Sequence, residues 1–158
     1  MIRYVVGDLF ANEFNAEALA HGCNCLGLMG AGIAVGFKAR YPDMYAEYKR
    51  MCLARPREFN PGDCFLWREE GKPAVFNLAT QEDLSGAEYA FVGAALENMR
   101  RVADEAGIKS IAMPRVSAGY GGLDWVRLRD IIEKAFDGWN GALYVYEGRA
   151  PSSAEVER

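Results

Sequence analysis

The glycine-rich stretch NCLGLMGAGIA, from Asn24 to Ala34, places Gly27, Gly30 and Gly32 among small and apolar residues. Because glycine has no Cβ, such a run either bends sharply or lets another molecule approach its backbone. The apolar run LAHGCNC at residues 19–25 predicts a strand, and helical spacing of apolar side chains begins at Gly32. The glycines therefore lie between a strand and a helix, where backbone N–H groups can bind an anion.

Strands and helices are predicted to alternate along the chain, since short apolar runs alternate with helical spacing. The first strand is expected to be central because it is rich in β-branched residues, and the third and fourth are expected to form a hairpin. This alternation predicts an α/β sandwich with a largely parallel sheet. The predicted strands are 2–6, 19–25, 63–67, 74–79, 108–113 and 142–146; the predicted helices are two pieces interrupted by Pro42, then 88–106 and 125–139, with a helical turn at 13–18.

A second glycine-rich stretch, SAGYGGL, occupies residues 117–123, between a predicted strand and a helix that starts near Asp124. Parallel sheets bind ligands at the carboxyl ends of their strands, where both stretches are expected to lie. Together they can hold a diphosphate from both sides without a lysine. Neither has the GxxxxGKS/T pattern, nor a GxGxxG run followed by an acidic residue after the first strand, so kinase-like phosphoryl transfer and a Rossmann site are disfavoured.

The composition indicates one globular domain, with 158 residues, 51% of them hydrophobic and 25% charged. A net charge of −4 gives no broad basic field, so we expect no direct binding to bare nucleic acid. No signal-peptide pattern or membrane-length apolar run is present, and we expect a cytoplasmic monomer without membrane contact. We expect no cofactor, no metal site and only free thiols at Cys23, Cys25, Cys52 and Cys64.

Three motifs resemble the macrodomain family: GDLF at 7–10, AHGCNCLGLMGAGIAVGFK at 20–38 and MPRVSAGYGGLDW at 113–125. Within it, the sequence is most similar to the terminal ADP-ribose protein glycohydrolases and their bacterial relatives. The resemblance implies a three-layer α/β/α sandwich with a central mixed, largely parallel sheet. It places the macrodomain at residues 1–148, followed by a flexible tail at 149–158, and implies ADP-ribose and mono-ADP-ribosylated proteins as partners.

The resemblance also implies roles for individual residues. Asp8 accepts a hydrogen bond from the adenine amino group, Leu9 offers a backbone N–H, and Tyr146 packs near the adenine. From the residues alone, Asp8 is as well explained as a turn residue and Tyr146 as an aromatic packed in the sheet. The diphosphate and distal ribose are expected between two sets of residues: Gly30, Ala31, Gly32 and Ile33 on one side, and Ser117, Ala118, Gly119, Tyr120 and Gly122 on the other.

The catalytic groups of that glycohydrolase branch do not carry over. A lysine follows the threonine of the strand here written NLATQ, and an aspartate lies in the second loop; this chain has Gln81 and Gly121 at these positions. A covalent intermediate on a lysine therefore cannot form at Gln81. Asn24 is the best-placed polar residue for the distal ribose, with a turn-capping amide as the alternative. The catalytic candidates are thus Asn24, Gln81 and Gly121, with the substrate's own diphosphate as a possible base.

Other polar residues have simpler explanations. His21 is expected to be a buried structural imidazole and Asp124 a helix N-cap. Glu82 and Asp83 are weak candidates for a general base, since exposed acids in turns usually have no such role. Cys23 and Cys25 have no basic neighbour in sequence that would activate a thiolate.

Three functions are consistent with the sequence. The first is a hydrolase that removes mono-ADP-ribose from acidic side chains of proteins. The second is a module that binds ADP-ribose without turnover, and the third is a phosphatase acting on ADP-ribose phosphate. We favour the hydrolase, because an isolated single domain gains little from binding alone.

Overall fold

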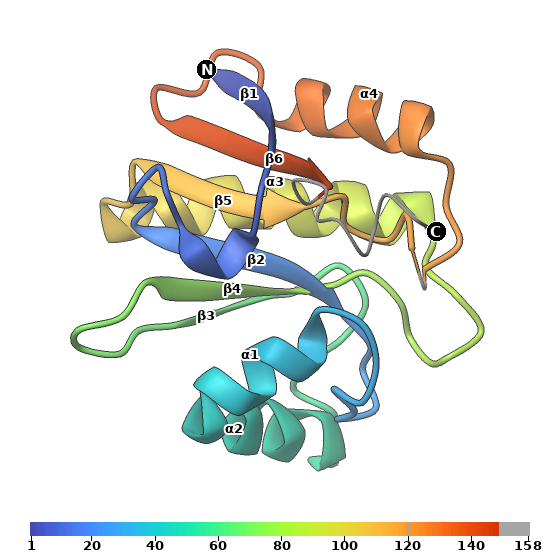
Figure 1. Ribbon diagram of the computed structural model, residues 1–158. Coiled ribbons are helices and arrows are strands. Elements are labelled where there is room, and N and C mark those ends of the chain that lie inside the picture. The colour runs from blue at the N-terminus through green and yellow to red at the C-terminus, as the bar shows by residue number, and fades with distance from the viewer. Residues whose placement is uncertain (120, 149–158) are drawn as a thin grey trace, which may run out of the picture.

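The computed structural model describes residues 1–119 and 121–148, so the predictions for Tyr120 and for a tail at 149–158 lie outside the described residues. A six-stranded sheet in the order β1-β6-β5-β2-β4-β3 forms the centre (Figure 1). The strands are β1 (Ile2–Val6), β2 (Ala18–Cys23), β3 (Cys64–Trp67), β4 (Ala74–Ala79), β5 (Ser110–Pro114) and β6 (Ala142–Gly148). The helices are η1 (Leu9–Ala11), α1 (Ala34–Arg40), α2 (Pro42–Leu53), α3 (Tyr89–Ala106) and α4 (Trp125–Ala135).

The sheet is mixed and largely parallel, as predicted. Among the described strands, β3 and β4 form the one antiparallel pair, which is the expected hairpin. Strands β4 and β2 are buried along nearly their whole length, which is typical of parallel strands covered on both faces.

The prediction that residues 2–6 form a central strand is wrong. Strand β1 lies at the edge of the sheet and pairs only with β6. Its side chains are half-buried or exposed, and Val6 is 53% exposed. β-branched residues favour a strand wherever it lies, because their side chains fit a pleated surface. They do not distinguish an edge strand from a central one, since that depends on long-range pairing.

Helices cover both faces of the sheet and complete the three layers (Figure 1). One core cluster joins α3 and α4 to the sheet through fully buried side chains such as Leu96, Met99 and Leu128. The other joins α1 and α2 to the opposite face through Phe37 and Tyr48. Burying one such side chain completely contributes about 1.5–3 kcal/mol. The three-layer arrangement is therefore fixed by two separate apolar cores.

Two predicted helical boundaries are wrong. The turn predicted at residues 13–18 lies earlier, as η1, because the Asp8 carboxylate accepts a hydrogen bond from the Phe10 N–H and caps it. Asn12 then closes the following loop by bonding both backbone groups of Ala16. Helix α4 ends at Ala135 rather than at residue 139, and the left-handed Gly138 follows in the turn.

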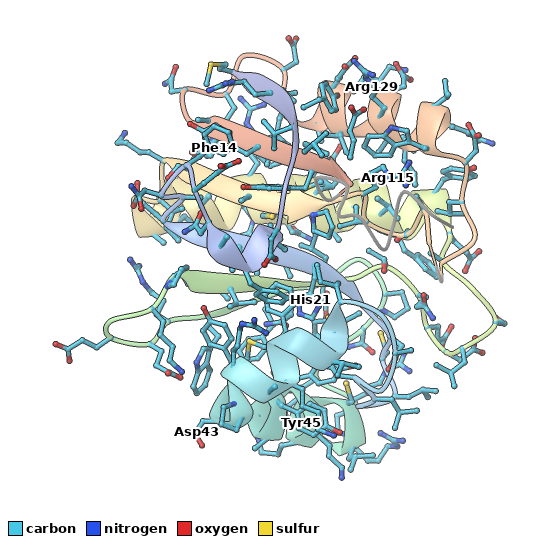
Figure 2. The ribbon with its side chains drawn as sticks, in the orientation of Figure 1. Phe14, His21, Asp43, Tyr45, Arg115 and Arg129 are labelled. Carbon is cyan, nitrogen blue, oxygen red and sulfur yellow. The ribbon has the colours of Figure 1, made fainter. Side chains whose placement is uncertain are left out.

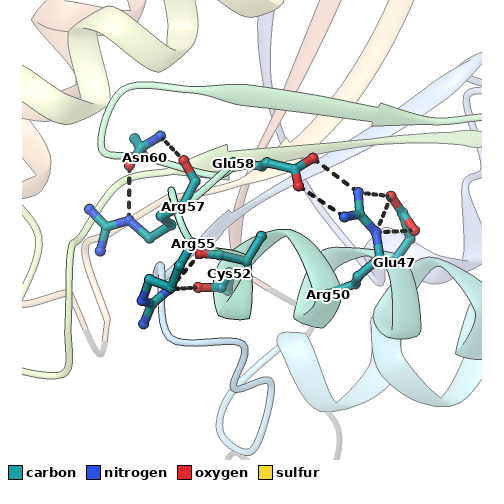
Figure 3. A network of polar contacts seen from close by, with 8 residues as sticks. Glu47, Arg50, Cys52, Arg55, Arg57, Glu58 and Asn60 are labelled. Atoms are coloured by element: carbon teal, nitrogen blue, oxygen red, sulfur yellow. Dashed lines mark hydrogen bonds and ion pairs between the residues drawn. The ribbon is translucent and has the colours of Figure 1, made fainter.

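The end of α2 carries a network of ion pairs on the surface (Figure 3). Arg50 contacts Glu47 at 2.7 Å and Glu58 at 3.0 Å. Because all three side chains are exposed, solvent screening makes the contribution of these ion pairs to folding stability small. They join α2 to the segment that leads into β3.

The four cysteines are free thiols, as predicted. Burial raises the pKa of the Cys25 and Cys64 thiols to about 12, so neither is an activated thiolate at neutral pH. Within the described ranges, no helix is long and apolar enough to cross a membrane, and no group of three or more histidine, cysteine or acidic residues is placed to hold a metal ion.

Candidate functional site

Three cavities lie side by side where the two glycine-rich stretches meet the sheet. The first, of about 260 Å³, is called the adenine compartment after its expected ligand. It shares Ile33 and Pro114 with a central compartment of about 240 Å³. The central compartment in turn shares Gly22, Ala31, Ala34 and Gln81 with an outer compartment of about 440 Å³. The three compartments are therefore neighbours, and together they are called the cleft.

The adenine compartment combines an aromatic ring with a carboxylate. Tyr146 and Asp8 both line it, together with Leu9 and Phe10. Tyr146 is 4% exposed, and its buried hydroxyl has no hydrogen-bond partner within the described residues. Burial, followed by the nearby carboxylates of Glu13 and Asp8, raises the pKa of this hydroxyl, so it is protonated and can donate. An unpartnered buried donor needs a ligand or water.

The position of Asp8 is compatible with both roles considered from the sequence, a turn residue and a ligand contact. Its Oδ1 accepts the Phe10 N–H at 3.0 Å, which is the turn role. The side chain is also exposed on the wall of the adenine compartment, where a second oxygen can accept a hydrogen bond from a ligand.

The central compartment is lined by both glycine-rich stretches. Gly32 and Ser117 have φ angles of 60° and 66°, in the left-handed region, so Ser117 holds a strained conformation for a residue with a side chain. The buried Ser117 Oγ has no hydrogen-bond partner in the part of the chain described. Helix α1 begins at this compartment without a side-chain cap. These groups have unused hydrogen-bonding capacity at the wall of this compartment.

Arg115 is the one charged side chain among the described residues that line the central compartment. It is exposed, and its guanidinium lies 5.7 Å from the centre of the Trp125 ring (Figure 2). A cation beside unpartnered donors favours an anionic ligand. Sequence reasoning missed Arg115, although it directly follows the strand whose end was identified as a binding position.

At two positions in the cleft an added Cβ would clash with its neighbours. A Cβ at Gly121 would lie 2.6 Å from the Ser117 Cα and carbonyl oxygen, and a Cβ at Gly22 would lie 2.8 Å from the Thr80 hydroxyl. The aspartate that the resemblance implies for the second loop therefore cannot occupy position 121 in this loop conformation.

Asn24 closes its own loop. Its Oδ1 accepts the N–H groups of Leu26 at 3.0 Å and Leu28 at 3.4 Å, and its Nδ2 donates to the Leu28 carbonyl at 2.8 Å. This is the turn-capping role that sequence reasoning kept as the alternative. Asn24 also lines the outer compartment, so a contact with the distal ribose stays a prediction.

Gln81 lies on the wall between the central and outer compartments. Its Nε2 donates to the Asp83 carbonyl at 2.6 Å, which leaves Oε1 without a hydrogen bond to the described residues. The neighbouring acids are engaged: Glu82 lies 3.3 Å from Arg57, and Asp83 accepts from Ser85. Those hydrogen bonds lower the pKa of Asp83, which makes it a weak base.

His21 and Asp124 have the structural roles predicted for them. His21 is fully buried, stacks on Phe37 and lies 2.7 Å from the Asn77 side-chain oxygen. Desolvation lowers the pKa of His21 to about 4, so it is neutral at pH 7. Asp124 caps α4 by accepting the Arg127 N–H at 3.0 Å.

Most residues predicted for the ligand meet in this cleft, although their roles stay predictions. Ala118 and Gly122 do not line any of the three compartments, and Ala118 packs against the core instead. Besides Arg115, sequence reasoning missed Gly22, Lys38, Tyr45 and Thr80. The predicted residues on the walls are Asp8, Leu9, Asn24, Gly30, Ala31, Gly32, Ile33, Gln81, Ser117, Gly119, Gly121 and Tyr146.

The fold is an α/β/α sandwich with glycine-lined compartments at one end of its sheet. Residues 20–132 match the family model of the Macro domain, and the chain belongs to this family. The family resemblance and the fold expected from sequence are thereby confirmed.

Comparison with known proteins gives three informative relatives. A DNA ADP-ribosyl glycohydrolase of Mycobacterium tuberculosis is 35% identical over 86% of this chain and 39% of its own length. An ADP-ribose 1″-phosphate phosphatase of Candida albicans is 26% identical over 92% of this chain and 99% of its own. The solved macrodomain of Mycobacterium tuberculosis DarG has a TM-score of 0.83 and 32% identity, covering 93% of this chain and 98% of that one. The chain thus spans about two fifths of the length of the curated mycobacterial relative.

Proposed function

We propose that this macrodomain binds ADP-ribose along the cleft and releases it by hydrolysis from an ADP-ribosylated macromolecule. The observation that carries the proposal is the row of adjoining compartments from Tyr146 to Gln81, with two buried hydroxyl groups on their walls that have no partner in the described structure. The adenine compartment supplies an aromatic ring and the Asp8 carboxylate for a base with an exocyclic amino group. The central compartment supplies Arg115 and the Ser117 hydroxyl for a diphosphate.

The distal ribose then reaches Gln81. Hydrolysis breaks the bond from the anomeric carbon to the acceptor atom, and the oxygen of a water molecule forms the new bond. A base takes one proton from that water, and the acceptor receives a proton as it leaves. With Gln81 in place of a lysine, the substrate's own diphosphate is the base that the site offers, and the free Gln81 Oε1 can orient the water. Positioning and electrostatics supply the rate enhancement.

We favour ADP-ribosylated DNA as the substrate over the protein carboxylate esters first expected from sequence. The mycobacterial relative is named for DNA and shares 35% identity with this chain. The net charge of −4 does not oppose such a substrate, because the ADP-ribose group, rather than a broad basic field, supplies the affinity. Bare DNA is still expected not to bind.

The second candidate function is a reader that binds ADP-ribose without turnover, and the glutamine at position 81 favours it. Because the mycobacterial relative extends well beyond the matched region, the size of this chain does not favour a hydrolase over a reader. A phosphatase is the least supported, since the described residues of the central compartment include no carboxylate or imidazole.

The test is to incubate the protein separately with an ADP-ribosylated oligonucleotide, a protein ADP-ribosylated on glutamate, and ADP-ribose 1″-phosphate. Released ADP-ribose is quantified, and ADP-ribose affinity is measured by calorimetry. Release with repeated turnover from the oligonucleotide supports the proposal, whereas binding without release from any substrate makes the protein a reader.

A matched pair of variants assigns the activity to the cleft. A Cβ at Gly119 meets nothing within 4 Å, so Gly119→Glu places a negative charge in the central compartment without a clash. Ala90→Glu adds the same charge at an exposed position on α3. Gly119→Glu is expected to abolish binding and release, and Ala90→Glu is expected to retain both.

A further inference from the structure

The outer compartment is the largest of the three cavities. The proposed function assigns neither the adenine nor the diphosphate to it. Gln81 separates it from the central compartment. By the family resemblance, Gln81 occupies the position of the lysine in the related glycohydrolases. Because the reacting carbon is placed at this wall by the proposed function, the group attached to that carbon must lie on the far side of it. The compartment is lined by Gly22, Cys23, Asn24, Leu28, Met29, Gly30, Ala31, Ala34, Lys38, Tyr45, Gln81 and Leu84.

The side chains of this compartment are mainly apolar, and one is aromatic. Leu28 and Leu84 are 47% and 66% exposed, so both present apolar surface at this cavity. Tyr45 from α2 is half-buried, and its orientation is fixed because its hydroxyl donates to the Gly27 carbonyl at 3.0 Å. Figure 2 shows Tyr45 in the α1–α2 layer below the sheet. Such a surface suits a flat apolar group.

Lys38 carries the one charge among the described residues that line the compartment. Its Nζ lies 4.4 Å from the centre of the Tyr45 ring, and no carboxylate of the described chain forms an ion pair with it. The acids of the adjoining loop are engaged, Glu82 with Arg57 and Asp83 with Ser85. A cation above an aromatic ring, with no acid on the walls, is complementary to an anionic partner.

We propose that the outer compartment binds the modified nucleotide of an ADP-ribosylated DNA strand, with the base against Tyr45, Leu28 and Leu84 and an adjacent phosphate on Lys38. This inference rests on the proposed function. An esterified glutamate or aspartate has lost its charge, and a peptide around it gives Lys38 no fixed anion. A nucleotide presents a flat base and a phosphate together, which matches both the apolar wall and the cation.

A contact between Lys38 and a phosphate makes the affinity for the ADP-ribosylated strand depend on salt concentration. One phosphate contact on a single strand contributes roughly 0.7 to the slope of log affinity against log salt concentration. Losing one charge-assisted hydrogen bond lowers affinity by about tenfold. Lys38→Ala should therefore weaken the ADP-ribosylated oligonucleotide relative to free ADP-ribose, and should flatten the salt dependence by about this slope.

The experiment measures the affinity of a short ADP-ribosylated single-stranded oligonucleotide, an ADP-ribosylated peptide and free ADP-ribose at several salt concentrations. Lys38→Ala, Lys38→Arg and Leu84→Glu are compared with Lys109→Ala, which removes the same charge from an exposed lysine before β5. We expect Lys38→Ala and Leu84→Glu to lower the ratio of oligonucleotide to ADP-ribose affinity, Lys38→Arg to restore most of it, and Lys109→Ala to leave it unchanged.

The outcomes separate this inference from the proposed function. Because the experiment measures affinity and not turnover, it tests the outer compartment even if the protein binds ADP-ribose without hydrolysing its substrate. An equal loss for the oligonucleotide, the peptide and free ADP-ribose would place Lys38 in the ADP-ribose site and overturn the inference. A loss confined to the peptide would make the occupant a protein. A chain that binds no ADP-ribose overturns the proposed function together with the inference.

Discussion

The Tyr48 hydroxyl on α2 donates a 2.7 Å hydrogen bond to the backbone carbonyl of Asn24, where the first glycine-rich stretch leaves the sheet. It also lies 3.0 Å from the Asn24 side-chain oxygen. Tyr48 is fully buried, so a helix in the α1–α2 layer holds one wall of the cleft in place. The glycines of the first stretch allow its backbone many conformations, and the hydrogen bond from Tyr48 restricts the backbone at Asn24.

Tyr48→Phe is therefore expected to lower both stability and ADP-ribose affinity. Leaving the Asn24 carbonyl without this donor costs about 1 kcal/mol in unfolding free energy. Tyr41→Phe is the matched control, because it removes a similar bond to Pro73. Denaturant unfolding and calorimetry measure the two quantities. If both variants lose stability alike and neither changes ADP-ribose affinity, Tyr48 has no specific role in the cleft.

Gly121→Ala is expected to lower ADP-ribose affinity by at least about tenfold, because its Cβ would lie 2.6 Å from the Ser117 backbone and must displace the second loop. Gly119→Ala has open space around the added methyl group and is expected to bind normally. Calorimetry compares the variants, and circular dichroism checks that each is folded. Equal affinities would show that the loop conformation does not determine binding.

Ser117→Ala removes a buried hydroxyl that has no partner in the described structure. If this hydroxyl serves a ligand, ADP-ribose affinity falls about fivefold while the free energy of unfolding stays unchanged or rises slightly. Ser110→Ala should do the opposite, since its hydroxyl accepts the Glu17 N–H at 2.8 Å at the other end of the sheet. A stability loss in Ser117→Ala with unchanged affinity would contradict the assignment.

Stability should fall on mild acidification because of His21. Its pKa is lowered from 6.5 to about 4 by burial, so between these pH values the unfolded chain binds a proton that the folded chain does not. The free energy of unfolding is thus greatest above pH 6.5, and this contribution, up to roughly 3 kcal/mol, is lost as the pH falls towards 4.

Urea unfolding at pH 7, 6 and 5 measures this effect. His21 is the only histidine in the chain, so other imidazoles do not contribute in this window. A His21→Phe variant is expected to be less stable at pH 7, because Asn77 loses its partner, but to show a flatter profile. The same slope in both proteins would mean that another group is responsible.

Local sequence patterns were enough to predict the helices and strands and to indicate where a site lies. Apolar periodicity is local, and it located all six strands and the main helices within a few residues. The two glycine-rich stretches identified the cleft, because only glycine permits such close backbone approach as at Gly121. The isolated cysteines and the single histidine in an apolar strand were likewise sufficient to predict free thiols and a buried imidazole.

Which residues lie next to one another depends on how distant segments pack. The edge position of β1, the hydrogen bond between Tyr48 and Asn24, and the placement of Lys38, Tyr45 and Gln81 around one cavity all depend on packing between distant segments. Local patterns do not encode such neighbours, because many helix and strand arrangements satisfy the same periodicity. The sequence therefore predicted a site for a nucleotide diphosphate, and the packing of α1 and α2 against the sheet forms the outer compartment beside it.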